Sequence, residues 1–286
     1  MKKRLKIEEI LSGVNVPSED NGERFTNSER LDFVKDFLNK TNFTLVKELD
    51  LSLIYRHAKY QKSEPIILIS SHIDALYSEY FLKEYNKTEL IGTFDNSICN
   101  CILLYLMAEN RLPSNVFIAF TGDEERNSKG AQETAKFLRE NNYNTMMAIV
   151  LDITGEGYDR HSFTIENYSI PPKCRFKNYL GFDTEEKMEI YLRRILKDFK
   201  RVKFIGDADP DEASEYSDYN LCSFSFCFPT RPHPDNEGEV SYVWMHSDKG
   251  ILIKKKTIKL YMGALLKLLN GIHKEIKHLK IGGLNG

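Results

Sequence analysis

A histidine and a carboxylate, His72 and Asp74, lie at the end of an apolar run that begins at Pro65. Side chains at positions i and i+2 of a strand point to the same side, so Asp74 can accept a hydrogen bond from one ring nitrogen of His72. Such a carboxylate fixes the tautomer of a histidine whose other nitrogen binds a metal. Alone, this pair is more typical of a structural histidine, and the rest of the chain decides its interpretation.

Three more carboxylates follow apolar runs of strand length. Glu124 and Glu125 come after the run 116–120, and two adjacent carboxylates repel each other unless a cation compensates them. A metal could bind one of them while the other takes a proton from bound water. The simpler alternative is a solvated turn. Asp152 ends the run 146–151, where an unpaired charge is costly and pairing with a metal is one remedy.

Asp95 and His246 complete the candidate set. Asp95 precedes a helix predicted to begin near Ser97, where a helix cap is the simplest role, and His246 precedes the last predicted helix. As a functional residue, Asp95 would bridge two divalent ions roughly 3.5–4 Å apart, because an anion between them offsets their repulsion. Two histidines and three carboxylates as ligands, with one carboxylate left free, suit zinc.

The hydrophobic pattern predicts the elements that must position these side chains. From residue 65 onward, strand-length apolar runs alternate with helical patterns, which predicts crossover units. We expect an α/β fold with a mostly parallel, mixed central sheet and helices on both faces. The predicted strands are 66–70, 115–121, 146–153 and 221–228; the predicted helices are 97–109, 131–140, a short piece near 213–220 and 248–279, with one more helix-strand round at 184–206.

Two further helices, 5–13 and 27–40, and an antiparallel strand pair, 43–49 and 51–55, precede this alternation. Ligands of open α/β sheets bind beyond the carboxyl ends of the strands, where we expect the predicted site residues to converge. The last helix would turn an apolar stripe toward the core, formed by Ile251, Ile253, Ile258, Tyr261, Ala264 and Leu265.

Composition limits the class of protein. The chain has 286 residues, enough for one compact unit, and its 40 basic and 42 acidic residues give no reason to expect nucleic acid or an anionic membrane as partner. No stretch reaches the roughly 20 apolar residues that span a bilayer. The five cysteines include no CxxC motif, and the first residues lack the apolar core of a secretion signal, so we expect a cytoplasmic protein with Cys99 and Cys101 in the core.

Taken in order, the motifs resemble those of the di-zinc exopeptidases of the aminopeptidase and carboxypeptidase type. The resemblance covers roughly residues 65 to 270 and implies the zinc-exopeptidase (phosphorylase/hydrolase-like) fold. The motifs are Ser-His-Ile-Asp at 71–74, Gly-Thr-Phe-Asp-Asn at 92–96, Phe-Thr-Gly-Asp-Glu-Glu at 120–125 with Ser-Lys-Gly-Ala at 128–131, Leu-Asp-Ile-Thr at 151–154 and Met-His-Ser at 245–247.

The resemblance also implies a role for each residue. Two divalent ions per chain are expected, zinc in first place, with cobalt or manganese possible. The implied ligands are Asp95 as a bridge between both ions, His72 and Asp152 at one ion, and Glu125 and His246 at the other; Asp74 would orient His72, and the Asp95–Asn96 peptide is expected to be cis.

The implied mechanism is hydrolytic. The metals would lower the pKa of a shared water toward roughly 7, and Glu124 would take its proton as the general base. The resulting hydroxide would attack the carbonyl of a peptide bond, and Glu124 would return the proton to the leaving amine. Relatives often supply a tyrosine to the oxyanion, and Tyr242 is the candidate because it lies close to His246 in sequence.

The spacing of the ligands limits inserted domains. Only 22 residues separate His72 from Asp95, which is too few for the lid domain that tetrahedral-particle aminopeptidases insert there. The core elements need most of the 93 residues between Asp152 and His246, where another branch inserts a dimerising lid. We therefore expect a single catalytic domain over residues 1–286, without a lid, as a monomer or small homo-oligomer.

These expectations favour a zinc-dependent aminopeptidase that removes N-terminal residues from short peptides. A carboxypeptidase or amidohydrolase would use the same centre with a different anchor for the substrate, so a small peptide or amide is the expected partner. Two more distant functions on the same fold are a glutaminyl-cyclase-like aminoacyltransferase and a non-catalytic binding module.

Two segments have only a general interpretation: 155–182 is expected to shape the substrate pocket, and 207–212 to form a solvated turn.

Overall fold

The structure, a computed structural model, describes most of the chain. The described residues are 5–16, 19–20, 25–26, 28–160, 162–174, 183–199, 201–206 and 208–277, without the side chains of Glu19, Asp20, Phe25, Thr26, Ser28 and Tyr242.

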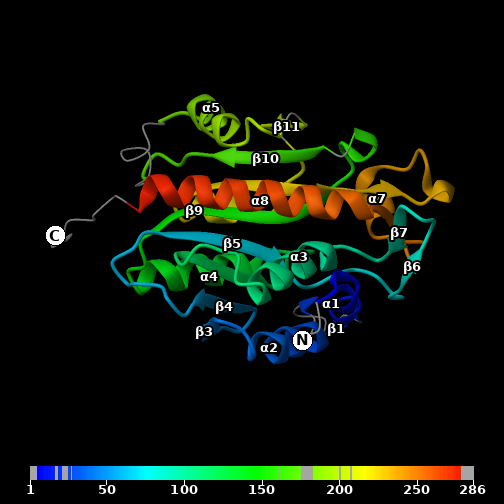
Figure 1. The fold of residues 1–286 in the computed structure, drawn as a ribbon, viewed down its shortest axis with the longest axis horizontal. Coiled ribbons are helices and arrows are strands. Elements are labelled where there is room, and N and C mark those ends of the chain that lie inside the picture. Colours follow the sequence, from blue (N-terminus) through cyan, green and yellow to red (C-terminus); the bar gives the residue numbers. More distant parts are fainter. Residues whose placement is uncertain are drawn as a thin grey trace.

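An eight-stranded mixed sheet forms the centre of the described fold (Figure 1). Its four middle strands are parallel to one another, and antiparallel pairs lie toward both edges. This arrangement confirms the predicted fold class. The strand order is β11 (Val202–Ile205), β10 (Phe163–Ser169), β12 (Cys222–Pro229), β9 (Thr145–Thr154), β5 (Ile66–His72), β8 (Val116–Thr121), β4 (Ser52–His57) and β3 (Phe43–Glu48).

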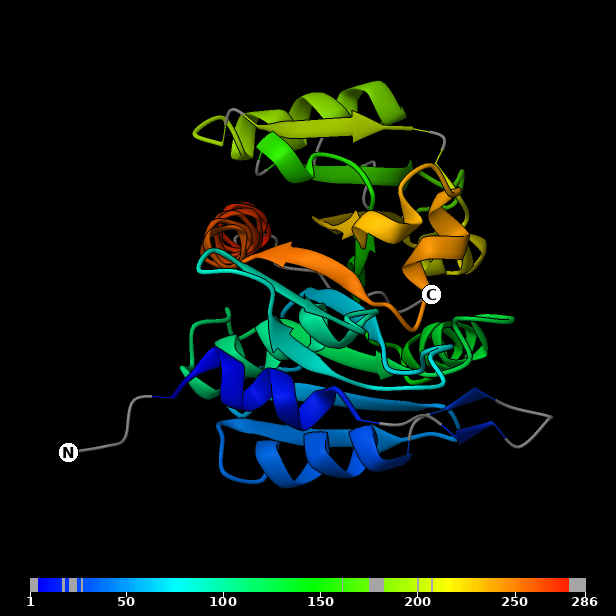
Figure 2. The same cartoon turned by 90° about the vertical axis from the view of Figure 1, so that its right-hand side faces the viewer.

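Helices cover both faces of this sheet, as Figure 2 shows with the red helix α8 and the green helix α4 on opposite sides. The buried strand residues separate into two apolar clusters, one on each face, because successive side chains of a strand point to opposite sides. One face carries α1 (Ile7–Val14), α2 (Ser28–Leu38), α3 (Ser97–Ala108), α5 (Glu185–Ile195) and α8 (Lys255–Ile276); the other carries α4 (Lys129–Glu140) and α6 (Glu212–Asp218).

The predicted start of the last helix is wrong. The helix begins at Lys255, and the residues before it form strand β14 (Ile251–Lys254), so Ile251 and Ile253 are buried from a strand. The reason is Gly250, whose φ of +77° interrupts a helix, followed by a run rich in isoleucine that finds a pairing partner. The rest of the predicted stripe, from Ile258 to Leu265, is buried in α8 as expected.

Strand β14 belongs to a second, four-stranded sheet beside the main one. It pairs with β7 (Glu89–Gly92), which also pairs with β6 (Leu82–Glu84), and β13 (Arg231–Pro232) lies at the other edge. The hairpin formed by β6 and β7 therefore lies within the interval between His72 and Asp95. Residues 19–20 and 25–26 form the small pair β1 and β2.

The segment 155–182 contains a strand that the sequence pattern does not predict. Residues 163–169 form β10, which lies in the main sheet between β11 and β12. Its buried Phe163 and Ile165 alternate with polar residues, but the pattern is short and Asn167, with a φ of +49°, interrupts it. Residues 175–182 lie outside the described part.

Two of the five cysteines are paired. Cys174 and Cys222 form a disulfide that nothing in the sequence pattern indicates, because 48 positions separate them. Cys99 and Cys101 are free and buried, as expected, and Cys227 is also free and buried. Among the described helices, none combines the length and apolar character needed to cross a bilayer.

The contact between β14 and β7 generates a stability prediction. A Cβ atom on Gly250 would lie 2.8 Å from the carbonyl oxygen of Gly92, whereas one on Gly238, with a φ of +93°, would meet no atom within 4 Å. We expect Gly238→Ala to cost only backbone strain, about 1–2 kcal/mol. Gly250→Ala adds a backbone clash and should cost about 1–3 kcal/mol more. Urea denaturation measures both free energies of unfolding, and equal losses would contradict the predicted clash.

Candidate metal centre

The predicted site residues converge beyond the carboxyl ends of the parallel strands. His72 is the last residue of β5, Asp152 lies near the end of β9, and Glu124 and Glu125 follow β8 by a few residues. Strands β5, β8 and β9 are parallel neighbours, so their carboxyl ends meet at one edge. Asp95 directly precedes Asn96, the residue before the first turn of α3, and the remaining ligand candidate comes from farther along the chain.

His72 turns its two ring nitrogens to different partners. Its Nε2 atom lies 3.2 Å from Oδ1 of Asp95 and 3.5 Å from Oδ1 of Asp152. Its Nδ1 atom lies 3.2 Å from the carbonyl oxygen of Asp74 and 3.7 Å from the Asp74 carboxylate. Asp74 also accepts a hydrogen bond of 3.1 Å from the backbone N–H of Glu125. Asp74 is thus placed to orient His72, and it connects the end of β5 with the loop after β8.

His246 approaches the other side of the cluster. It follows the short helix α7 (Ser241–Met245), and its Nδ1 atom lies 3.8 Å from Oε2 of Glu125 and 3.9 Å from Oδ2 of Asp95. The two oxygens of Asp95 therefore face different histidines. His72, Asp95 and Glu125 each offer one potential ligand atom, and these three atoms lie within 4.8 Å of one another.

The burial of these carboxylates shows a shortage of positive charge. The side chains of Asp74, Asp95 and Glu125 are 0%, 7% and 4% exposed. Oδ1 of Asp74 and Oδ1 of Asp95 both face the ring of His72, and the buried Oε1 of Glu125 has no hydrogen-bond partner among the described residues. Unpaired buried charges are expensive, and a divalent cation among these oxygens would offset them. The residues present therefore fit a metal centre.

The pKa directions in the metal-free protein point the same way. Burial raises the pKa of Glu124 well above its usual value, and the charges of Asp152 and Asp74 add to this against the opposing effect of His72. Burial would lower the pKa of His72, but Glu124 and hydrogen bonds with Asp152, Asp74 and Asp95 raise it well above normal. Without metal, the cluster thus retains protons, which a bound cation would displace.

The Asp95–Asn96 peptide is cis, as the resemblance implied. A role of this pair as a helix cap is not supported, because Asn96 makes no side-chain cap bond to α3. Its side-chain amide instead donates to the carbonyl oxygen of Leu151 at 2.6 Å and to Oγ of Ser71 at 3.2 Å. Asn96 thereby ties the start of α3 to the two strands that carry Asp152 and His72.

Tyr77 is a site residue that sequence reasoning missed. Its hydroxyl donates a hydrogen bond of 2.6 Å to the carbonyl oxygen of Met245 and accepts one of 3.3 Å from the backbone N–H of Asp95. Tyr77 therefore fixes the segment before His246 beside Asp95. No local pattern marks it, because both partners come from other elements. Tyr242, the predicted oxyanion donor, lies in α7, but its side chain is outside the described part.

Glu212 is a second missed residue, and it corrects the end of the solvated turn predicted at 207–212, in which Asp209 and Pro210 are exposed as expected. Its side chain belongs to α6 and is fully buried, where it accepts a hydrogen bond of 2.8 Å from Ser70, whose hydroxyl accepts one of 2.8 Å from Tyr216. Asp211 caps α6 by accepting from the N–H of Ala213. Asp207 lies outside the described residues. Burial raises the pKa of Glu212 to about 7, although Thr121 and the charge of His72 oppose the shift.

A hollow of about 560 Å³ opens beside the predicted general base. Glu124 lies in its wall, and the other lining residues come from the loop after β8, the start of α4 and the start of α6. All of the lining side chains except Pro210 are polar. Besides Glu124 they are Arg126, Asn127, Ser128, Lys129, Gln132, Asp211, Ser214 and Glu215. The hollow thus reaches the cluster at Glu124, and none of the five ligand candidates lines it.

Glu212 generates a pH-dependent prediction. Its pKa is about 7 in the folded, metal-free protein against an ordinary value of 4.5, so the folded state holds a proton that the unfolded state releases. The contribution of Glu212 to the free energy of unfolding should therefore fall as the pH rises from about 4.5 to about 7, by up to roughly 3 kcal/mol.

Between pH 5 and pH 7 the fall should be smaller in Glu212→Gln, which cannot titrate, by about 2 kcal/mol. Urea denaturation of the metal-free proteins at pH 5 and pH 7 measures it. The same pH dependence in both proteins would contradict the assignment.

Comparisons with known proteins agree with this geometry. The sequence model of peptidase family M28 matches residues 53–220, more than half of the chain. No curated protein matches the chain.

Solved structures share the fold at low identity. A TET aminopeptidase from a marine sediment Thaumarchaeota archaeon has a TM-score of 0.66 at 13% identity, over 96% of each chain. The Pyrococcus horikoshii TET1 peptidase, which can assemble into a tetrahedron or a large octahedral shell, has a TM-score of 0.64 at 13% identity, over 92% of this chain and 99% of that one.

The aminopeptidase PepT from Bacillus cereus has a TM-score of 0.64 at 9% identity, over 93% of this chain and 97% of that one. At such identities the likeness shows the fold alone, and it confirms the predicted zinc-exopeptidase fold. The family match covers the motifs at His72, Asp95, Glu124, Glu125 and Asp152. The chain therefore belongs to peptidase family M28, which confirms the predicted family and the predicted enzyme class of peptidase.

Proposed function

We propose that this chain removes N-terminal residues from short peptides by metal-dependent hydrolysis, with two zinc ions per chain. The observation that carries the proposal is the position of Asp95, whose two carboxylate oxygens face His72 and His246. A carboxylate shared in this way is what two adjacent cations require.

The surrounding side chains divide into two groups around Asp95. We infer that His72 and Asp152 hold one ion, because His72 lies near Asp152 and near Oδ1 of Asp95. We infer that Glu125 and His246 hold the other, because His246 lies near Glu125 and near Oδ2 of Asp95. Bound zinc supplies a water of lowered pKa and polarises the carbonyl of the substrate. Asp74 keeps the Nε2 atom of His72 toward the ions through its contacts with the other ring nitrogen.

Glu124 remains the candidate for proton transfer. It is the carboxylate of the cluster left over when Asp95, Glu125 and Asp152 are assigned as ligands and Asp74 as the partner of His72, and it lies in the wall of the hollow that a substrate could enter. Burial raises the pKa of Glu124, which suits a group that takes a proton from water and returns it to the leaving amine. Tyr242 stays our candidate donor to the oxyanion, from its place shortly before His246.

We also propose that the chain acts as a single catalytic domain without a lid, as a cytoplasmic monomer or small oligomer. The absence of a lid is supported by the short hairpin β6–β7, which lies within the interval between His72 and Asp95. The large shells formed by the Pyrococcus horikoshii peptidase are a property of that protein.

A peptide panel tests the substrate class. Release of free amino acids from short peptides is compared with release from the same peptides acetylated at the amino terminus, with and without a chelator. We expect cleavage of the free peptides and loss of activity with the chelator. The acetylated peptides should be cleaved at least 100-fold more slowly, which corresponds to about 3 kcal/mol in the activation free energy. Equal cleavage of both series would support a carboxypeptidase or amidase instead.

The substitution Glu124→Gln tests the general base. The variant should keep its metal content, because this side chain is not a proposed ligand, and should lose activity by about 100-fold or more. Elemental mass spectrometry and the peptide assay measure the two quantities.

Glu140→Gln is the control for Glu124→Gln, because Glu140 is an exposed residue at the other end of α4 and should not affect activity. Undiminished turnover by Glu124→Gln would exclude Glu124 as the base.

A further inference from the structure

A second hollow lies at the opposite end of the parallel strands from the metal cluster. It has a volume of about 210 Å³, and the start of β9, the last turn of α4 and the residues between α6 and β12 line it. Helices α4 and α6 begin near Glu124 and end at this second hollow. The proposed peptidase reaction uses no residue of it.

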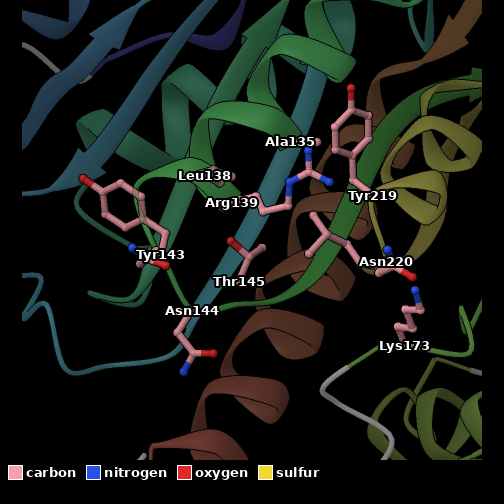
Figure 3. A pocket seen from close by; sticks show the side chains of 11 residues that line it. Ala135, Leu138, Arg139, Tyr143, Asn144, Thr145, Lys173, Tyr219 and Asn220 are labelled. Carbon is pink, nitrogen blue, oxygen red and sulfur yellow. The ribbon is translucent and has the colours of Figure 1, made fainter. Parts of the chain in front are cut away.

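The walls of this hollow carry positive charge without compensation. Eleven residues line it, of which Arg139 and Lys173 are cationic and none is acidic. Neither cation forms an ion pair with a carboxylate of the described residues. Figure 3 shows Arg139 and Lys173 on different sides of the hollow. The hollow is therefore suited to an anion.

Two buried polar atoms in the same walls lack a partner in the described structure. They are the hydroxyl oxygen of Thr145, a residue that is 8% exposed, and Nδ2 of Asn144. Leaving a buried donor unpaired costs about 1–3 kcal/mol. Both atoms are covered by neighbouring protein atoms, so a ligand in the hollow would not contact them directly, and the charge of Arg139 and Lys173 is the feature that a ligand would meet.

The geometry of Arg139 favours a planar contact with an oxyanion. Its Cζ atom lies 5.0 Å from the centre of the Tyr219 ring, which supports one face of the guanidinium group. A guanidinium group held in this way can present two parallel N–H groups to an oxyanion. Lys173 is held near the same space because the next residue, Cys174, is joined by a disulfide to Cys222 at the start of β12.

We propose that this hollow binds a compact oxyanion of the sulfate or phosphate type, either free or as the end group of a small molecule. Arg139 and Lys173 supply the charge. Asn220, also in the wall, adds an amide.

Calorimetric titration of the zinc-loaded protein with sodium sulfate, at constant ionic strength, tests the proposal. We expect saturable binding with a dissociation constant of about 1 mM or lower, and a loss of at least tenfold in Arg139→Gln. Arg56→Gln is the matched control, because Arg56 also lies over a tyrosine, 5.8 Å from the centre of the Tyr60 ring, but does not line the hollow. This control should bind sulfate as the unmodified protein does.

One more variant guards against a folding defect. Lys173→Gln removes the second charge and should weaken sulfate binding while the urea midpoint stays near that of the unmodified protein. Glycerol 3-phosphate distinguishes the two sources of the anion: tighter binding than sulfate indicates an ester, and equal binding a free ion. Absence of saturable binding up to about 20 mM sulfate, or unchanged binding in Arg139→Gln and Lys173→Gln, would overturn the proposal.

Discussion

The structure depends on a concentration of buried negative charge at the carboxyl ends of its parallel strands. Asp95 lies at the centre of this charge, with His72 on one side and His246 on the other. In the metal-free protein, protons supply much of the compensation, as the raised pKa values of His72 and Glu124 indicate. Such a cluster would be a poor way to stabilise a fold, and its presence is best explained by the cations that it can bind.

The surrounding elements hold this charge in place from several directions. The parallel strands bring His72, Asp152 and the loop after β8 to one edge, and Asn96 ties the start of α3 to two of these strands. The small second sheet joins Gly92, shortly before Asp95, to Ile251, shortly after His246. Because these ties come from distant parts of the sequence, the position of each ligand depends on the whole fold rather than on its own element.

Much of the site could be predicted because its residues stand at places that a periodic pattern reveals. His72 and Asp152 end apolar runs, and the glutamate pair follows one. Prediction failed where a position depends on distant partners. Strand β14 needs β7 to exist as a strand, and the buried state of Glu212 depends on Ser70, 142 positions earlier. A local pattern reports polarity, but it does not report which polar group a later strand or helix will cover.

Whether the acidic cluster around Asp95 holds two zinc ions can be observed by X-ray diffraction. Crystals of the zinc-loaded protein would be measured on both sides of the zinc absorption edge. We expect two anomalous peaks that disappear below the edge, one between His72, Asp95 and Asp152 and one between Asp95, Glu125 and His246. A single peak would contradict the role of Asp95 as a bridge, and no peak at Asp95 under zinc-replete conditions would contradict the metal centre itself.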